Sequence, residues 1–407
     1  MHVVACRWEP FSLGVLLDEG ASVSLVIDEW ESINRRLDPE LISRLYDLHV
    51  VASFDAMDAM AALATDLGER TRPDLVVSLC EYGQFGAAYL AHVLGLPEPG
   101  IALSVRTRDK RAMKLALRSA GVPCARFATL ECRDGEGTLN RIAETFTFPV
   151  VVKPVAGMGT VDTFIVETEQ ALRSRAGRIP RHGHLLVEEM IDGDEYHVDG
   201  VWVRGQPQLF GVSRYLVPRI RINSPGVDNG SALIPPSADP AIYEQAAGLQ
   251  ERVNRALGIC DGITHMEMFR RPDGELVFSE IATRPAGGGI TLTFRQWGAD
   301  IRTVWIRSLI GRAAPPELRP SGGYVGWVNI GPSTPGRIVR VPSPEEVARF
   351  SYVRDVVRWR DVGDVLPTLH PSTWTMMLVF EARSWEQYVE RAADLQSALA
   401  LRTRAEP

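Results

Sequence analysis

Apolar runs alternate with amphipathic segments over residues 1–100. Each run is rich in Val, Leu or Ile, which predicts a buried strand. The runs are His2–Cys6, Ser22–Ile27, His49–Ser53 and Leu75–Leu79. The segments between them predict helices at Phe11–Glu19, Pro39–Asp47, Ala56–Arg70 and Phe85–Leu94. This alternation predicts a small parallel α/β domain.

The pattern becomes mixed after this domain. One amphipathic helix is predicted at Thr107–Ala120, where Gly121 ends it and Pro123 prevents its continuation. Further strands are predicted at Pro149–Pro154, Leu185–Ile191 and Tyr196–Val203, and a further helix at Tyr243–Leu257. Arg214–Ser237 is polar and broken by Pro and Gly, and a loop of that length is often a lid over a site.

The segment Gly262–Ile290 carries the clearest short-range signal in the chain. Two apolar runs, Ile263–Phe269 and Leu276–Ile281, flank Arg271–Glu275, whose Pro-Asp-Gly core is typical of a hairpin turn. With Arg271 opposite Leu276, the count along both strands puts Glu267 directly across from Glu280.

The two glutamates of this hairpin suggest a cation site. Cross-strand partners hold their Cβ atoms roughly 5 Å apart, and facing like charges destabilise a sheet. A positive group is therefore expected between Glu267 and Glu280, and hard carboxylate oxygens suit Mg²⁺. Arg284 lies at even spacing from Glu280 and can project from the same face. The alternative is a solvated hairpin that carries two unrelated glutamates.

Gly311–Gly323 is rich in Pro and Gly and predicts a linker or domain boundary. Beyond it lie short strands and one helix at Ser384–Ala398, which opens with the capping-box pair Ser384 and Gln387.

Composition narrows the class of protein. The chain of 407 residues predicts two or three domains, and its net charge of −7 argues against a nucleic-acid-binding surface. We find no apolar run of membrane-spanning length, and Met1–Pro10 lacks a signal-peptide pattern. The 5 cysteines are scattered and form no CxxC pair, which favours free thiols in a reducing cytoplasm.

Lysine is rare in this chain. Of 44 basic residues only Lys110, Lys114 and Lys153 are lysines, so each is a candidate for a compact point charge. Lys153 closes an apolar strand and is expected to point into a cleft. The loop Ala156–Thr160 follows, and its glycines would let backbone amides approach an anion. Lys110 and Lys114 stand among arginines, a pattern typical of a solvated helix face.

The order of these segments resembles the ATP-grasp superfamily of carboxylate–amine or carboxylate–thiol ligases. Arg108-Asp109-Lys110 with Met113 resembles the family's first nucleotide lysine. Val151–Pro154 with the glycine loop resembles its second lysine and phosphate flap. The stretch Val187–Glu195 resembles the adenine-contacting hinge. Glu267 and Glu280 match the two metal-binding glutamates of the family, and Arg284 matches the arginine four residues further on.

The resemblance implies a role for each matched residue. ATP and Mg²⁺, or Mn²⁺ in its place, would be the cofactors, with the metal on Glu267 and Glu280 and with Arg284 as the catalytic group. The implied nucleotide-binding residues are Lys110, Lys153, Gly157, Gly159, Thr160, Glu188, Glu189, Ile191 and Glu195, the last of them on the ribose hydroxyls. One position departs from the family, because Ala282 stands where Asn is usual and removes one Mg²⁺ ligand.

The resemblance also implies a fold and a reaction. The fold class is α/β: an ATP-grasp module at 106–315, with its flap at about 121–200, preceded by a parallel α/β domain at 1–105 and followed by a C-terminal α+β segment at 316–407. The long chain most resembles the L-amino-acid ligases. The expected reaction activates a small carboxylate as an acyl phosphate and transfers it to an amine, without nucleic-acid or membrane partners. A thiol acceptor and a non-catalytic nucleotide sensor are the alternatives, and the sequence leaves a homo-oligomer open.

Overall fold

The computed structural model describes residues 1–96, 100–131, 135–176, 183–223, 229–320, 322–369 and 373–405. Its N-terminal part is the predicted parallel sheet, with strand order β3-β2-β1-β4. The strands are β1 (His2–Cys6), β2 (Ser22–Asp28), β3 (Asp47–Val51) and β4 (Leu75–Ser78). The helices of this part are α1 (Pro10–Asp18), α2 (Glu29–Asn34), α3 (Pro39–Ser43), α4 (Met57–Arg70) and α5 (Gln84–Val93).

The helix predicted at Thr107–Ala120 is two helices, α6 (Ile101–Arg108) and α7 (Lys110–Ser119). The break lies at Asp109, whose backbone is extended and whose carboxylate accepts from the backbone N–H groups of Arg111 and Ala112. Asp109 is therefore the N-cap of α7, a role that the apolar periodicity alone did not reveal.

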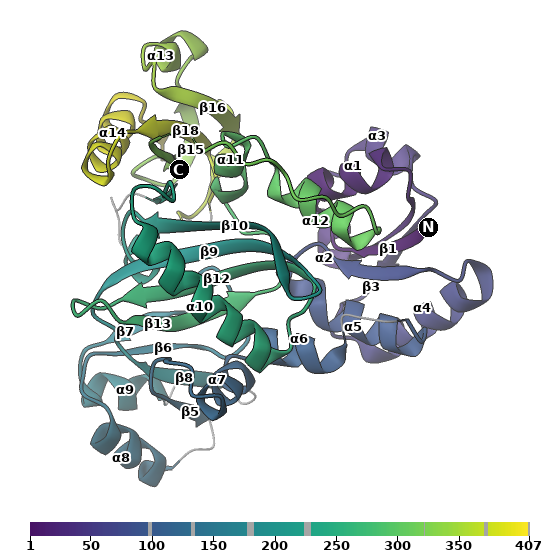
Figure 1. Cartoon of the computed structure of the whole chain (residues 1–407), viewed down its shortest axis with the longest axis horizontal. Helices are drawn as coiled ribbons and strands as arrows, with labels where there is room; N and C mark the ends of the chain where they lie inside the picture. The colour runs from purple at the N-terminus through teal and green to yellow at the C-terminus, as the bar shows by residue number, and fades with distance from the viewer. Residues whose placement is uncertain are drawn as a thin grey trace.

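A four-stranded antiparallel sheet with order β5-β8-β6-β7 forms the flap (Figure 1). Its strands are β5 (Phe127–Glu131), β6 (Val150–Pro154), β7 (Phe164–Val166) and β8 (His184–Glu189). Helices α8 (Glu136–Thr145) and α9 (Glu169–Ala176) cover one face. The flap has a hydrophobic core of its own, which includes Val150, Val152 and Val187.

An eight-stranded sheet forms the centre of the molecule, in the order β13-β12-β9-β10-β11-β14-β18-β16. Its strands are β9 (Asp194–Val203), β10 (Gln206–Tyr215), β11 (Gly230–Leu233), β12 (Gly262–Arg270), β13 (Leu276–Ala282), β14 (Tyr324–Ile330), β16 (Val353–Arg358) and β18 (Met376–Ala382). The helices in this part of the chain are α10 (Pro240–Leu257), α11 (Ile290–Arg295), α12 (Ile301–Leu309), α13 (Pro344–Ala348) and α14 (Trp385–Ala398).

The C-terminal strands continue this central sheet, because β14 pairs with β11. A separate small sheet of order β17-β15-β19 completes the C-terminal part. Its strands are β15 (Gly336–Arg340), β17 (Val365–Leu366) and β19 (Arg402–Arg404). Residues 311–320 form neither helix nor strand, while residue 321 of the predicted linker lies outside the described residues. The division at 105 and 315 into three folding units remains our proposal.

The N-terminal sheet is fixed to the central sheet by a shared hydrophobic core. That core combines Leu25 of β2 with Val201 of β9 and with Trp305 of α12. Helix α12 packs on both α1 and β9, and this places the N-terminal part beside the central sheet (Figure 1).

The predicted lid loop at 214–237 is shorter than expected. Arg214 and Tyr215 end strand β10, and 230–233 form β11, so the two ends of the segment belong to the central sheet. Between them, Arg219–Asn223 form a 3₁₀ helix, and residues 224–228 lie outside the described residues.

The hairpin of β12 and β13 confirms the central prediction: Glu267 pairs directly with Glu280. The route to that register differs from the expected one. Arg270 rather than Arg271 faces Leu276, so the turn is one residue longer. A bulge between Glu267 and Met268 then restores the predicted pairing.

Candidate active site

A cavity of about 1120 Å³ lies where the N-terminal part, the flap, the central sheet and the C-terminal strands meet. It is lined by every residue to which the family resemblance assigns a site role. These are Lys110, Lys153, Gly157, Gly159, Thr160, Glu188, Glu189, Ile191, Glu195, Glu267, Glu280 and Arg284. Residues from four separate stretches of chain thus reach one space.

The carboxylate of Glu280 lies close to the ammonium groups of two lysines. Its carboxylate lies 3.1 Å from Lys110 Nζ and 3.9 Å from Lys153 Nζ. Burial alone would lower the pKa of Lys153, but Glu188 and Glu280 outweigh burial and raise it. Both lysines therefore bring positive charge to the face of the hairpin that carries the two glutamates, where anionic phosphates would be stabilised.

Glu267 is held from its other side. Tyr215 donates a hydrogen bond of 2.9 Å to its carboxylate, and His265 Nε2 lies 3.5 Å away. Burial acts to raise the pKa of Glu267, yet the hydrogen bond and charge of His265 lower it to about 2. The carboxylate is thus ionised, as a metal ligand must be.

The glycine loop after β6 is tied to the start of α7. Lys110 Nζ donates to the carbonyl of Gly157 at 2.8 Å, and Arg108 donates to the carbonyl of Ala156 at 2.9 Å. Gly159 and Thr160 both adopt left-handed backbone, with φ of 62° and 61°. Two such residues in succession make a tight turn beside the lysines, which is favourable for a phosphate-binding loop.

The hinge residues differ in what holds them. Glu189 forms an ion pair with Arg126 at 2.8 Å. Glu195 is buried, and its carboxylate accepts from the backbone N–H of Arg219 at 2.6 Å. Burial and the nearby charge of Glu267 raise the pKa of Glu195 to about 8. A protonated Glu195 can donate a hydrogen bond, which suits a hydroxyl-bearing ligand such as a ribose.

The prediction of a solvated face for the basic helix was wrong at Lys114. Its side chain is fully buried, and its ammonium lies 3.0 Å from the carboxylate of Glu188 on β8. Lys110 is buried as well, at 5 % exposure. Helix α7 packs these lysines inward against the flap and the hairpin, and the partner of Lys114 is too distant in sequence for a local pattern to reveal it.

Glu81 contributes to the site from the N-terminal part of the chain, outside the segments that resemble the family. It follows β4 in the N-terminal part and lies 2.6 Å from Arg284 Nε and 2.5 Å from Arg108. Although burial opposes ionisation, the two arginines hold the pKa of Glu81 below its usual value. Glu81 therefore fixes Arg284 at the end of the hairpin. The neighbouring Tyr82 is 50 % exposed.

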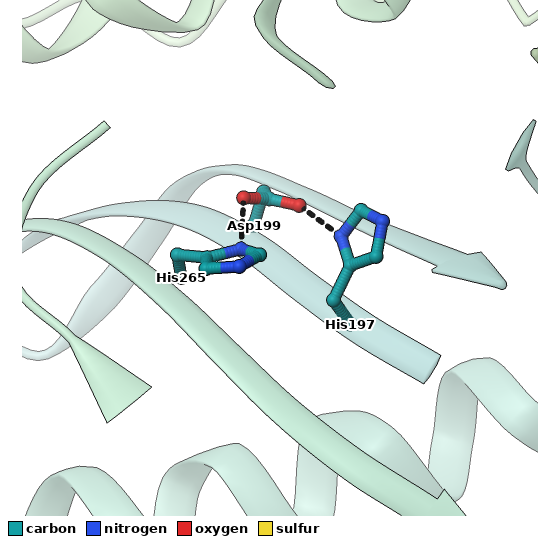
Figure 2. A group of neighbouring side chains, drawn as sticks. All are labelled: His197, Asp199 and His265. Carbon is teal, nitrogen blue, oxygen red and sulfur yellow. Dashed lines mark hydrogen bonds and ion pairs between the residues drawn. The ribbon is translucent and has the colours of Figure 1, made fainter. Parts of the chain in front are cut away.

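A buried hydrogen-bonded row crosses the central sheet behind Glu267. Asp199 accepts from His197 Nδ1 at 2.6 Å and from His265 Nδ1 at 2.9 Å (Figure 2). The row continues from His197 to Ser231 at 3.0 Å and ends at the indole of Trp327, which donates to Ser231 at 2.7 Å. Sequence periodicity indicated none of these contacts, since they join four strands.

Three of these side chains, His197, Asp199 and His265, also have the spacing of a metal site. The two ring nitrogens that face Asp199 contact different oxygens of its carboxylate: His197 Nδ1 contacts Oδ2, and His265 Nδ1 contacts Oδ1. Each oxygen thus accepts a hydrogen bond from one ring, and these hydrogen bonds account for the grouping of the three side chains without a cation. The row supports Glu267 by orienting His265.

Removal of the shared carboxylate should destabilise the fold. We expect Asp199→Asn to lower the free energy of unfolding by about 3 kcal/mol, because a buried charge partner is lost and one imidazole N–H must face an amide N–H. Urea unfolding followed by circular dichroism measures this change. Asp273→Asn, in the exposed hairpin turn, is the control and should leave the midpoint unchanged; equal midpoints for both variants would contradict the role of the row.

The other end of the cavity is aromatic. Trp327 and Trp374 make an edge contact with ring centroids 5.9 Å apart, and Trp359 lies 6.2 Å from Trp374. Gly288 lies close under this wall, since a Cβ there would come within 2.9 Å of Trp374. Gly288 follows Arg284 by four residues, so the segment that carries the arginine also reaches the aromatic wall.

Ala282, the position that departs from the family pattern, is opposite His265 in the hairpin and lines the cavity. Its methyl group offers no oxygen to a cation. Among the described residues, Glu267 and Glu280 are the facing carboxylates of this hairpin, and they fit a divalent cation by charge and by donor chemistry.

Comparisons with known proteins agree with this geometry. Residues 116–299 match the family described as the D-Ala–D-Ala ligase C-terminus. A crystal structure of an L-amino acid ligase from Bacillus licheniformis superimposes with a TM-score of 0.79 at 18% sequence identity, and the match covers 99% of this chain and 98% of that one. Over residues 116–299 the chain is similar to the ATP-grasp ligases, as predicted from the sequence.

Relatives of known activity lie in the predicted class. The L-arginine-specific L-amino acid ligase of Bacillus subtilis is 25% identical over 362 residues, which cover 87% of this chain and 84% of the relative. The D-alanine–D-alanine ligase of Desulforudis audaxviator is 29% identical over 220 residues, or 52% of this chain and 70% of the relative. The predicted kinship with ADP-forming carboxylate–amine ligases, and with L-amino-acid ligases in particular, is confirmed.

Proposed function

We propose that this protein joins an amino acid, through its carboxylate, to the amine of a second small molecule at the expense of ATP. The observation that carries the proposal is the alignment of Glu267 and Glu280 across one hairpin, with Lys110 and Lys153 at the second carboxylate. Two acidic ligands and two ammonium groups on one face suit a polyphosphate with its divalent cation. Residues of the hinge and the glycine loop extend the same cavity toward a nucleotide base.

Each charged group has a task in this reaction. Glu267 and Glu280 would hold Mg²⁺, or Mn²⁺ in its place, which supplies charge neutralisation on the phosphates. Lys110 and Lys153 would neutralise the α- and β-phosphate oxygens. Arg284, anchored by Glu81, would stabilise the transferring phosphoryl group and the later tetrahedral adduct.

The chemistry is balanced by two displacements. A carboxylate oxygen of the amino acid attacks the γ-phosphorus, and the bond to the β–γ bridging oxygen breaks, which gives an acyl phosphate and ADP. The acceptor amine then attacks the acyl carbon, loses a proton and expels inorganic phosphate. The flap, which carries the glycine loop between β6 and β7, would exclude water that otherwise hydrolyses the acyl phosphate.

We place the side chain of the activated amino acid against Trp374 and Trp359, which line the cavity beside the buried Trp327. Indole faces favour apolar and aromatic groups and, through cation–π contact, a guanidinium. The test is ADP release with MgATP and a panel of single and paired amino acids that includes L-phenylalanine, L-leucine and L-arginine, with the product read by mass spectrometry. We expect ADP release that depends on the amino acid and a product with an amide bond.

The two alternatives give different results in the same assay. A thiol acceptor would leave an acyl phosphate that hydroxylamine traps but no amino-acid pair consumes. A nucleotide sensor would bind ATP and release no ADP under any condition. The cavity favours the enzyme, because Arg284 is fixed beside the glutamates rather than turned to solvent.

A cytoplasmic location and a homo-oligomeric assembly are further proposals. Among the described residues no helix is long and apolar enough to cross a membrane. Cys6, Cys80, Cys124 and Cys260 are free thiols, which supports our proposal of a reducing, cytoplasmic setting.

Ala282→Asn should lower the Mg²⁺ concentration that gives the half-maximal rate, by about threefold, because an amide oxygen would join Glu267 and Glu280 on the cavity wall. A Mg²⁺ titration of ADP release for parent and variant measures the change. An unchanged or higher Mg²⁺ requirement in a folded variant would show that position 282 does not reach the metal.

A further inference from the structure

Glu188 stands between two buried lysines. One carboxylate oxygen lies 3.0 Å from Lys114 Nζ, and the other lies 3.0 Å from Lys153 Nζ. The two lysines differ in access: Lys153 lines the cavity, whereas Lys114 is fully buried between α7 and β8 and lies outside the cavity wall. Lys114 therefore has no route to a ligand and acts through Glu188.

The charges around Lys153 present a conflict for nucleotide binding. Lys153 is 3.0 Å from Glu188 and 3.9 Å from Glu280, so carboxylates already hold the ammonium that would meet a phosphate. If Lys153 were the sole partner of Glu188, moving it to a phosphate would leave a buried carboxylate unpaired. Such a loss costs several kcal/mol, enough to oppose binding.

Lys114 removes this conflict. Its ammonium stays beside Glu188 whatever Lys153 does, because the side chain is enclosed by protein and rests over the ring of Phe278, 5.9 Å from the centroid. Burial and the two lysines act on Glu188 in opposite directions, and the lysines hold its pKa below the usual value. Glu188 thus stays ionised.

We propose that Lys114 is a positioning residue: its buried ammonium neutralises Glu188, and this leaves Lys153 available to the phosphates of the nucleotide. Helix α7 then performs two tasks from one face. Lys110, in its first turn, reaches the cavity. Lys114, one turn later, contacts Glu188 from the side of that carboxylate that faces away from the cavity. This inference rests on the proposed nucleotide function.

The test separates phosphate binding from base binding. Isothermal titration measures the affinities of ADP and adenosine for the full chain without turnover. In Lys114→Met, Lys153 is the remaining cation beside Glu188, and the ion pair between them competes with the phosphates for Lys153. The affinity for ADP should therefore fall by about tenfold or more, as expected for coupling through one shared group. Adenosine affinity should change by less than about twofold, because adenosine has no phosphate to compete for Lys153.

Two further variants sharpen the result. Arg118→Met removes one positive charge from the exposed side of the same helix and should leave both affinities unchanged. The double variant Lys114→Met/Glu188→Gln removes both the negative charge of Glu188 and the ammonium group that neutralises it. Lys153 is then free of Glu188, and the double variant should regain most of the lost ADP affinity. If Lys114→Met does not fold, Lys114→Gln keeps a polar group beside Glu188 and should show the same selective loss of ADP binding.

The outcomes distinguish this inference from the proposed function. A parent protein that binds neither ADP nor ATP would overturn the nucleotide function itself. A parent that binds ADP, with equal losses of ADP and adenosine in the Lys114 variants, would show a merely structural lysine. A parent and Lys114 variants with equal ADP affinity would likewise refute the positioning role.

Discussion

Glu280→Gln is expected to reduce amino-acid-dependent ADP release by about 10²-fold or more while the protein stays folded. Glu280 faces Glu267 across the hairpin and lies near both Lys110 and Lys153. The amide keeps the shape of the side chain but removes the charge that a divalent cation needs and that balances the lysines. Glu280 is the residue of β13 that pairs with Glu267 in the described hairpin, so no neighbouring side chain of β13 can take its place.

The measurement is a Mg²⁺ titration of ADP release at saturating ATP and amino acid. Glu275→Gln makes the same chemical change in the exposed turn of the same hairpin and is the matched control. If excess Mg²⁺ restores the full parental rate to Glu280→Gln, the residue contributes affinity alone. If the rate equals that of Glu275→Gln at every Mg²⁺ level, Glu280 is not a metal ligand.

Arg284→Lys should lower kcat by about 10²-fold and change the affinity for ADP only slightly. Arg284 holds Glu81 through Nε and donates to the carbonyl of Pro285 through Nη1. The guanidinium therefore has fixed orientation, and its planar fork can contact two oxygens of a transferring phosphoryl group at once. Lysine offers one point charge at a different place, and the loss is confined to the transition state.

Steady-state kinetics and ADP titration together test this role. Arg295→Lys is a matched control, because Arg295 also pairs with a carboxylate, Asp300, outside the cavity. An unchanged kcat in Arg284→Lys would remove the arginine from the catalytic groups. A large loss of ADP affinity without a loss of kcat would place it among the nucleotide-binding residues.

Local sequence signals accounted for the strands of the N-terminal sheet and for the pairing of Glu267 with Glu280. Period-two and buried-strand patterns are set by neighbouring residues, and hairpin pairing follows from the turn. The turn itself is one residue longer than predicted, and the bulge beside Glu267 compensates. The longer turn and the bulge shift the register in opposite directions and cancel. The register at Glu267 and Glu280 is therefore the predicted one, because the side chains of each strand that belong to the buried face must stay on that face.

Contacts between distant segments account for what the sequence did not reveal. Lys114 looked solvated because its neighbours on α7 are arginines, yet its partner Glu188 lies on a strand of the flap. Glu81 and Arg284 are 203 residues apart in sequence. The row from Trp327 to His265 needs four strands to be paired before any of its hydrogen bonds exists.

The scarcity of lysine gives this protein an unusual chemical simplicity. Its three lysines, Lys110, Lys114 and Lys153, converge on one site, and none is more than 8 % exposed. Apart from the α-amino group, every primary amine of the chain therefore belongs to the site. Acylating or reductively alkylating reagents label most proteins over their whole surface. Besides the α-amino group, they would here meet the two cavity lysines, Lys110 and Lys153, and would report on that cavity and on whatever shields it.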